Sequence, residues 1–232
     1  MTNGVCVIAM GGGGFTHGED PALESYCLRQ LPDQPQIGFI GAASQDNPDR
    51  IARFYERFRD SATGLRHLPM TADAQQATDW VQGLGMVYVG GGNTAQMLAG
   101  WRATGIDAVL LAAARAGVVM AGVSAGAVCW FEYAMWDGNG TGFRPLEGLG
   151  LIAGSCCPHY SSEPARRPAF RDHVAGRLIP AGLAIDDGAA VRLGANGVQE
   201  VFSARPGAGA YALRQSAKAP DGWQETPINS AQ

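Results

Sequence analysis

The chain has 232 residues, of which 46% are hydrophobic and 16% are charged, and its formal net charge is -4. This composition excludes a disordered chain, and the negative charge gives no electrostatic reason to expect nucleic acid or an anionic membrane as a partner. The length suits one large α/β domain, which we expect over residues 1–217, followed by a polar C-terminal tail over residues 218–232.

The cysteines and the lack of a targeting segment favour a cytoplasmic protein. The five cysteines are odd in number, and Cys156 and Cys157 are adjacent, which indicates reduced thiols. The sequence has no CxxC pair that would indicate a zinc site, and we expect no metal and no cofactor. No apolar run is long enough to span a bilayer, and the N-terminus lacks the basic start of a signal peptide.

Short buried strands alternate with helices through the first half of the chain. Continuous apolar runs, which mark strands buried on both faces, occur at residues 5–10, 37–43, 65–68, 86–89 and 117–122. Helices are expected between them, over residues 21–31, 48–58, 72–82, 95–101 and 106–116. This alternation predicts a mostly parallel sheet that helices cover on both faces.

Loops rich in glycine or small polar residues follow four of these strands. They lie at residues 11–14, 44–46, 90–94 and 122–126. In parallel sheets, ligands bind at the carboxyl ends of the strands. We therefore expect these loops to meet at one edge of the sheet and to form the functional site.

The pattern loosens in the second half of the chain. Residues 137–142 are expected to form a loop, and residues 148–152 a strand-like run. A strand, a turn and a second strand are expected over residues 183–191. Antiparallel strands at the sheet edge are predicted over residues 198–202 and 208–213, and a frayed tail from Lys218 onward.

The motif Gly122-Val123-Ser124-Ala125-Gly126 joins a buried strand to an apolar run suited to a buried helix. Gly-x-Ser-x-Gly at such a junction is the nucleophile-elbow pattern, in which the glycines allow a sharp turn that leaves the serine hydroxyl exposed above the sheet. Ser124 is therefore the candidate nucleophile. The alternative is a tight turn whose small residues only allow close packing.

A nucleophilic serine needs a base, and histidine is the available residue type. Lys218 is the only lysine and lies in the polar C-terminal end, which excludes a Ser-Lys dyad, a Schiff-base lysine and a Walker phosphate loop. His159 follows a strand and comes after Ser124 in the chain, so we expect it to be the base. The alternative is a structural histidine paired with Glu163. His17 could line the same cleft or lie in a surface loop.

The sequence also offers oxyanion donors and an orienting acid. The donors would be the amide of Ala125 and one from Gly91 or Gly92, because glycine lets the main chain approach the tetrahedral intermediate. For the acid we prefer Asp137, which lies just past the helix that follows the elbow. Glu132 is the alternative, although a straight helix would carry it about 12 Å along the axis from the serine.

Five blocks of this sequence together resemble peptidase E, the serine peptidase family that also includes the cyanophycinases and aspartyl dipeptidases. They are Gly90-Gly91-Gly92-Asn93-Thr94, Gly122-Val123-Ser124-Ala125-Gly126-Ala127, Cys129-Trp130-Phe131-Glu132, Pro158-His159-Tyr160 and Ile185-Asp186-Asp187-Gly188-Ala189-Ala190. The resemblance implies a three-layer α/β/α sandwich with a mostly parallel sheet, of the class I glutamine-amidotransferase-like type. It also implies a Ser-His-acid triad onto which Ser124 and His159 fall directly, with Asp or Glu as the acid.

The resemblance further implies an enzyme, a serine-type peptidase that hydrolyses small peptides in the manner of a dipeptidase. Aspartyl dipeptidases of this family cleave after an N-terminal aspartate, which needs a cationic pocket. Arg166 and Arg167 could supply one, although adjacent arginines are more often a solvated pair. Asn93 and Thr94 are further candidates for substrate binding. The expected partner is a small peptide, with no nucleic acid and no membrane, and a homodimer remains open.

Two other functions compete with this interpretation. Gly90-x-Gly92-x-x-Ala95 matches the dinucleotide fingerprint, which also requires an acidic residue at the end of the next strand. Asp107 is the acidic residue nearest that spacing, but it is expected at a helix start. The other alternative is a catalytically silent relative that serves as a binding module.

Overall fold

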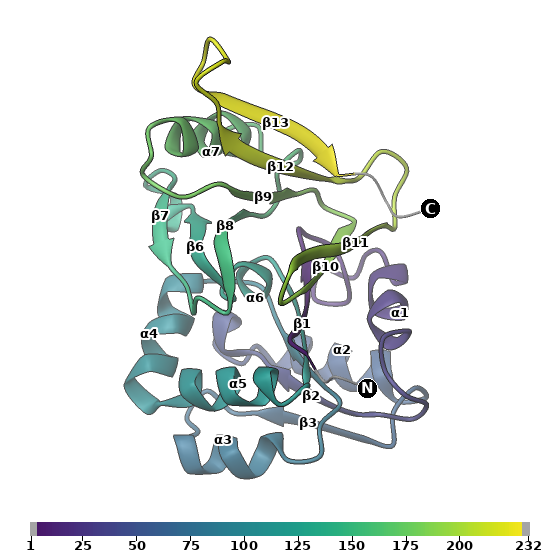
Figure 1. Ribbon diagram of the computed structural model, residues 1–232. Helices are drawn as coiled ribbons and strands as arrows, with labels where there is room; N and C mark the ends of the chain where they lie inside the picture. Colours follow the sequence, from purple (N-terminus) through teal and green to yellow (C-terminus); the bar gives the residue numbers. More distant parts are fainter. Residues whose placement is uncertain (1–3, 229–232) are drawn as a thin grey trace.

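The computed structural model describes residues 4–228, which form two β-sheets and seven α-helices (Figure 1). The central sheet has seven strands, and the five in its middle and at one edge run parallel. Its strands are β1 (Cys6–Met10), β2 (Gln36–Ile40), β3 (Gly64–Leu68), β4 (Met86–Val89), β5 (Val119–Val123), β10 (Ala189–Gly194) and β11 (Gly197–Ser203), in the order β11-β10-β1-β5-β4-β2-β3. The antiparallel strands β10 and β11 close the other edge.

Helices cover both faces of this sheet, as its continuous apolar strands predict (Figure 1). Alternate residues of one strand point into different cores: Met86 and Tyr88 into one, Val87 and Val89 into the other. The first core is closed by α1 (Ala22–Leu28) and α2 (Pro48–Phe58), the second by α3 (Ala74–Val81), α4 (Thr94–Thr104) and α5 (Ile106–Arg115). The predicted three-layer α/β/α sandwich is thus confirmed.

A second sheet packs beside the first and carries the later part of the chain. Its strands are β6 (Phe131–Trp136), β7 (Arg144–Glu147), β8 (Ile152–Cys157), β9 (Gly182–Ile185), β12 (Ala210–Gln215) and β13 (Trp223–Ile228), in the order β13-β12-β9-β8-β6-β7. Helix α7 (Arg166–Ala175) packs on it (Figure 1). Of the strands predicted as edge additions, only β11 joins the central sheet, whereas residues 210–215 belong to the second one.

Two other local predictions are wrong. The helix after Ser124, α6 (Ala125–Val128), has only four residues. The aromatic run that follows enters β6, where it gains ladder hydrogen bonds to β7 and β8. The frayed tail is also incorrect for Trp223–Ile228, which pair along the whole of β12. Residues 229–232 of that predicted tail lie outside the described residues.

Within residues 4–228, no single helix is long and apolar enough to cross a membrane, and α4 and α5 meet that criterion only as a pair bent by 92°.

The carboxyl ends of the parallel strands bring the predicted loops together. The amide of Ser124 donates to the carbonyl of Met10 at 3.0 Å, which ties the end of β5 to the end of β1. The amide of Asn93 donates to the carbonyl of Ala43 at 2.8 Å, which ties the loop after β4 to the loop after β2. These loops therefore meet at the edge of the sheet where the sequence predicts the functional site.

Candidate active site

Ser124 stands on a strained turn between β5 and α6. Its backbone has φ 54° and ψ -113°, a conformation that a non-glycine residue adopts only where the surrounding structure enforces it. A Cβ atom on Gly122 would overlap the carbonyl oxygen of Gly126, and one on Gly126 would overlap that of Val89. Both glycines of the motif are therefore required for the turn to pack against β4.

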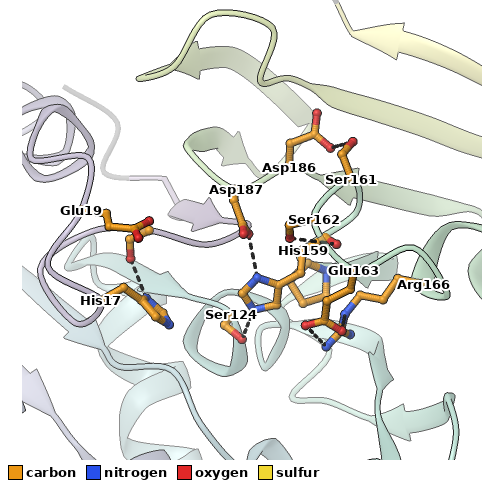
Figure 2. Close-up of polar contacts among 12 residues, drawn as sticks. His17, Glu19, Ser124, His159, Ser161, Ser162, Glu163, Arg166, Asp186 and Asp187 are labelled. Atoms are coloured by element: carbon orange, nitrogen blue, oxygen red, sulfur yellow. Dashed lines mark hydrogen bonds and ion pairs between the residues drawn. The ribbon is translucent and has the colours of Figure 1, made fainter.

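The Ser124 hydroxyl heads a chain of three hydrogen-bonded side chains (Figure 2). His159 Nε2 lies 2.9 Å from Ser124 Oγ, and His159 Nδ1 lies 2.6 Å from Asp187 Oδ1. The side chains of His159 and Asp187 are 15% and 24% exposed, so this pair is largely shielded from solvent.

Charge on Asp187 fixes the tautomer of His159. Burial raises the pKa of Asp187, but the hydrogen bond and charge of His159 and the charge of Arg205 help to outweigh it, so the pKa lies below its usual value. An ionised carboxylate only accepts hydrogen bonds. His159 Nδ1–H therefore donates to Asp187, and Nε2 faces the hydroxyl of Ser124.

The glycines that follow β1 make room for this pair of side chains. A Cβ atom on Gly12 would overlap the Asp187 carboxylate and lie 2.7 Å from His159 Nδ1. The carbonyl of Gly12 also accepts a hydrogen bond of 3.0 Å from the amide of Gly188. Gly12 is thus explained by its close approach to the His159–Asp187 pair.

Of the predicted oxyanion donors on the loop after β4, Gly91 lies against Ser124. A Cβ atom built on Gly91 would be 3.3 Å from Ser124 Cβ. Within residues 4–228, no hydrogen bond engages the amides of Gly91, Gly92 or Ala125, whereas the amide of Ser124 itself is used by Met10. These three amides therefore have no hydrogen-bond partner among the described residues, as the prediction of oxyanion donors requires.

Comparison with known proteins decides the family. The sequence profile of peptidase family S51 matches residues 7–201. The chain belongs to peptidase family S51. It is also 40% identical over 208 residues to the uncharacterized peptidase YgaJ of Bacillus subtilis strain 168, covering 88% of this chain and 90% of that protein. Family S51 groups serine peptidases of the peptidase E type, so this chain is a serine peptidase.

Two crystal structures of peptidases share the fold of this S51 member. One is a peptidase from an acI-B1 actinobacterium, with a TM-score of 0.71, 15% identity and coverage of 100% of this chain and 97% of that one. The other is a putative peptidase E from Listeria monocytogenes EGD-e, with a TM-score of 0.66, 17% identity and coverage of 86% and 98%. The predicted α/β fold is thereby confirmed as the fold of these peptidases.

The structure corrects the predicted acid of this S51 chain. Asp137 accepts a hydrogen bond of 3.0 Å from the amide of Asn139 and caps a short turn. Glu132 lies on a strand instead of a helix, and it accepts a hydrogen bond of 2.8 Å from the amide of Gly154. Neither carboxylate is bonded to His159, whereas that of Asp187 is.

A signal for Asp187 was present in the sequence. His159 and Asp187 each lie two residues beyond a strand, β8 and β9 respectively. These strands are parallel neighbours, so residues that follow them emerge side by side. This signal can be used only if β8 and β9 are known to pair. The two strands are far apart in the sequence, so no local pattern reveals their pairing.

The two predicted substrate arginines of this S51 peptidase are already ion-paired. Arg166 is 6% exposed and donates to Glu163 at 2.7 Å and to the carbonyl of Met135 at 3.2 Å (Figure 2). Arg167 pairs with Glu225 of β13 and lies over the ring of Tyr160. Both guanidinium groups therefore have their charge satisfied within the fold.

Two further predicted residues border the site differently. Asn93 caps α4 through the amide of Gln96 at 3.0 Å and donates to the side chain of Asn139 at 3.0 Å, which links the loop after β4 to the loop after β6. Thr94 is 5% exposed, so its side chain faces the core. Of the two, only Asn93 has a side chain that is not buried, and that side chain is bonded to Asn139 and the Gln96 amide.

Sequence reasoning left the place of His17 open, and the structure brings it to the site. The rings of His17 and His159 have centroids 6.5 Å apart. His17 is exposed, and its Nδ1 is bonded to the carbonyl of Gly13 at 2.9 Å (Figure 2). The glycine run after β1 thus also presents a second imidazole at the mouth of the site.

Proposed function

We propose that this chain hydrolyses small peptides with Ser124 as nucleophile, His159 as general base and acid, and Asp187 as the orienting acid. The observation that carries the proposal is the chain of hydrogen bonds of 2.9 Å and 2.6 Å that joins these three side chains. The turn at Ser124 has the strain and the flanking glycines of a nucleophile elbow. The order Ser, His, Asp is one of several that build this constellation.

In the proposed reaction Ser124 Oγ attacks the carbonyl carbon of the peptide while His159 Nε2 takes the hydroxyl proton. The resulting imidazolium is stabilised by Asp187 and gives that proton to the leaving amine, which departs and leaves an acyl-enzyme. A water molecule then repeats the attack with His159 as base, and the acid product is released. The amides of Ala125 and Gly92 bind the oxyanion in both steps.

The loops around the site favour short substrates. His17 and its glycine loop stand on one side of His159, and we infer that the loops joined by the contact between Asn93 and Asn139 border another. Walls on two sides suit a small peptide better than a segment of a folded protein. A dipeptidase-like activity is therefore the proposed form.

Selection of an N-terminal aspartate would need a cationic group with no partner in the protein. The pairing of Arg166 with Glu163 and of Arg167 with Glu225 counts against an aspartate pocket made from these arginines. We therefore propose cleavage of small peptides without a strong preference for N-terminal aspartate. A dipeptide panel of Asp-X, Glu-X, Gly-X and β-aspartyl substrates decides this point, since a marked Asp-X preference would contradict it.

Ser124→Ala is the direct test of the mechanism. We expect it to lower kcat on the best dipeptide by about 10⁴-fold or more. The melting temperature should stay close to that of the wild type, because serine and alanine have the same backbone strain at this turn. Ser25→Ala, at an exposed serine of α1, is the matched control and should keep full activity. Turnover by Ser124→Ala at the wild-type rate would end the proposal.

Neither competing function gains support from the site. The Gly90–Ala95 segment packs against Ser124 and Ala43, and Asp107 lies in the first turn of α5, where it cannot complete a dinucleotide fingerprint. A silent binding module would have no need of an aligned serine, imidazole and carboxylate. Hydrolysis is therefore the function that the geometry supports best.

A further inference from the structure

Arg50 makes an unusual contact behind the loop that follows β4. It lies in the first turn of α2, and its Nη1 donates to the carbonyl oxygen of Gly91 at 2.7 Å. Arg50 is half-buried, and within residues 4–228 it forms no ion pair. A partly buried guanidinium without a carboxylate is costly, so its place behind this loop calls for an explanation.

We propose that Arg50 is a positioning residue for the oxyanion hole, holding the Gly91–Gly92 peptide so that the Gly92 amide donates to the oxyanion. This inference rests on the proposed function of Ser124. In a trans peptide the carbonyl and the following N–H point in opposite directions. Because the carbonyl of Gly91 points at Arg50, the N–H of Gly92 points away from α2, to the side on which Gly91 lies against Ser124.

Other hydrogen bonds hold the two ends of the loop that contains this peptide. The amide of Gly90 donates to the carbonyl of Ile40 at 3.0 Å, and that of Asn93 donates to the carbonyl of Ala43 at 2.8 Å. These bonds fix both ends of the loop, but neither involves the peptide between Gly91 and Gly92. The bond from Arg50 is the one that sets the orientation of this peptide.

Charge gives Arg50 a second effect on the same peptide. A guanidinium bonded to a carbonyl polarises the peptide group and makes its N–H a stronger donor. The negative charge that this donor meets exists only in the tetrahedral transition state and intermediate. Arg50 therefore stabilises the transition state more than the bound substrate, so its loss should appear in kcat and leave KM nearly unchanged.

The test compares Arg50→Met and Arg50→Lys with Arg59→Met, a control that removes the same charge from an exposed arginine at the end of α2. We expect Arg50→Met to lower kcat on the best dipeptide by about 10- to 100-fold, less than the loss of a whole oxyanion donor, with KM within about twofold. Arg50→Lys should recover part of the rate, because it keeps a charged donor. The control should match the wild type.

A second readout separates positioning from substrate binding. Phosphonylation of Ser124 by a small uncharged fluorophosphonate uses the oxyanion hole but no peptide subsite, so Arg50→Met should slow it by a factor similar to that in kcat. An unchanged phosphonylation rate, or a rise in KM confined to acidic peptides, would overturn the inference and assign Arg50 to substrate binding. Arg50→Gln gives the same test should the methionine variant lose its cooperative melting transition.

Failure of the inference is distinguishable from failure of the proposed function. Wild-type protein that is phosphonylated on Ser124, together with an Arg50→Met variant that reacts equally fast, would reject only the role of Arg50. Wild-type protein that is not phosphonylated, together with an active Ser124→Ala variant, would reject the proposed mechanism itself, and the role of Arg50 with it.

Discussion

At the scale of single residues, the site depends on where side chains are absent as much as on where they are present. Gly12 has no function of its own, yet it lies against both Asp187 and His159. Ser124 could be singled out from sequence because its motif is local, and His159 because it follows a strand. The acid could not, because its place depends on the pairing of β8 with β9.

Gly12→Ala should therefore disable the enzyme without touching a reactive group. The new Cβ would overlap the Asp187 carboxylate, so the bond from His159 to Asp187 must lengthen or break. We expect kcat/KM on dipeptides to fall at least 100-fold. Gly100→Ala is the control: no atom lies within 4 Å of the added methyl group on α4, so activity should persist and stability should rise by about 0.5–1 kcal/mol. Full activity in Gly12→Ala would show that His159 and Asp187 can move apart without loss of catalysis, which contradicts this prediction.

Asp187→Asn tests which carboxylate orients the base. An amide at this position would favour the wrong tautomer of His159, and we expect kcat to fall by about 10³- to 10⁴-fold. Asp137→Asn, at the carboxylate predicted from sequence, changes only the cap of a short turn and should leave kcat within about twofold of the wild type. A large loss of kcat in Asp137→Asn together with a nearly normal kcat in Asp187→Asn would identify Asp137 as the acid.

At the scale of elements, β13 is the strand that the sequence least revealed. Its residues Trp223–Ile228 alternate weakly and follow a polar stretch, so local pattern indicated a tail. The strand forms because it pairs along β12 and because Glu225 bonds to Tyr160, Arg167 and Arg171. Those partners lie more than fifty residues away, and no local signal announces them.

Glu225 should therefore stabilise the second sheet in a pH-dependent manner. Burial raises its pKa, but hydrogen bonds from Tyr160, Arg167 and Arg171 outweigh that effect and the pKa lies below its usual value. A carboxyl with a lower pKa in the folded state contributes stability above its unfolded pKa of about 4.3 and loses it as the pH falls through the folded value.

We expect Glu225→Gln to lower the free energy of unfolding by about 2 kcal/mol at pH 7, measured by urea denaturation. The difference from the wild type should shrink below about pH 4, where the wild-type carboxyl takes up its proton. A difference that stays constant from pH 7 to pH 3 would mean that charge at Glu225 contributes nothing.

At the scale of the whole molecule, the site is assembled where the two sheets meet. Ser124 follows β5 of the central sheet, His159 follows β8 of the second sheet, and Asp187 lies in the turn that joins β9 of the second to β10 of the first. The first half of the fold could be predicted because its strands are continuous apolar runs. The second sheet could not, because its strands are partly exposed and several of them pair across long stretches of chain.

This arrangement makes the activation of Ser124 by His159 the central claim of the account, and chemical labelling tests it directly. Wild-type protein treated with a fluorophosphonate and analysed by intact mass and peptide mapping should carry one adduct, on Ser124, formed far more slowly in His159→Ala. An adduct on another residue, no adduct at all, or an equally fast reaction in His159→Ala would contradict the central claim that His159 activates Ser124.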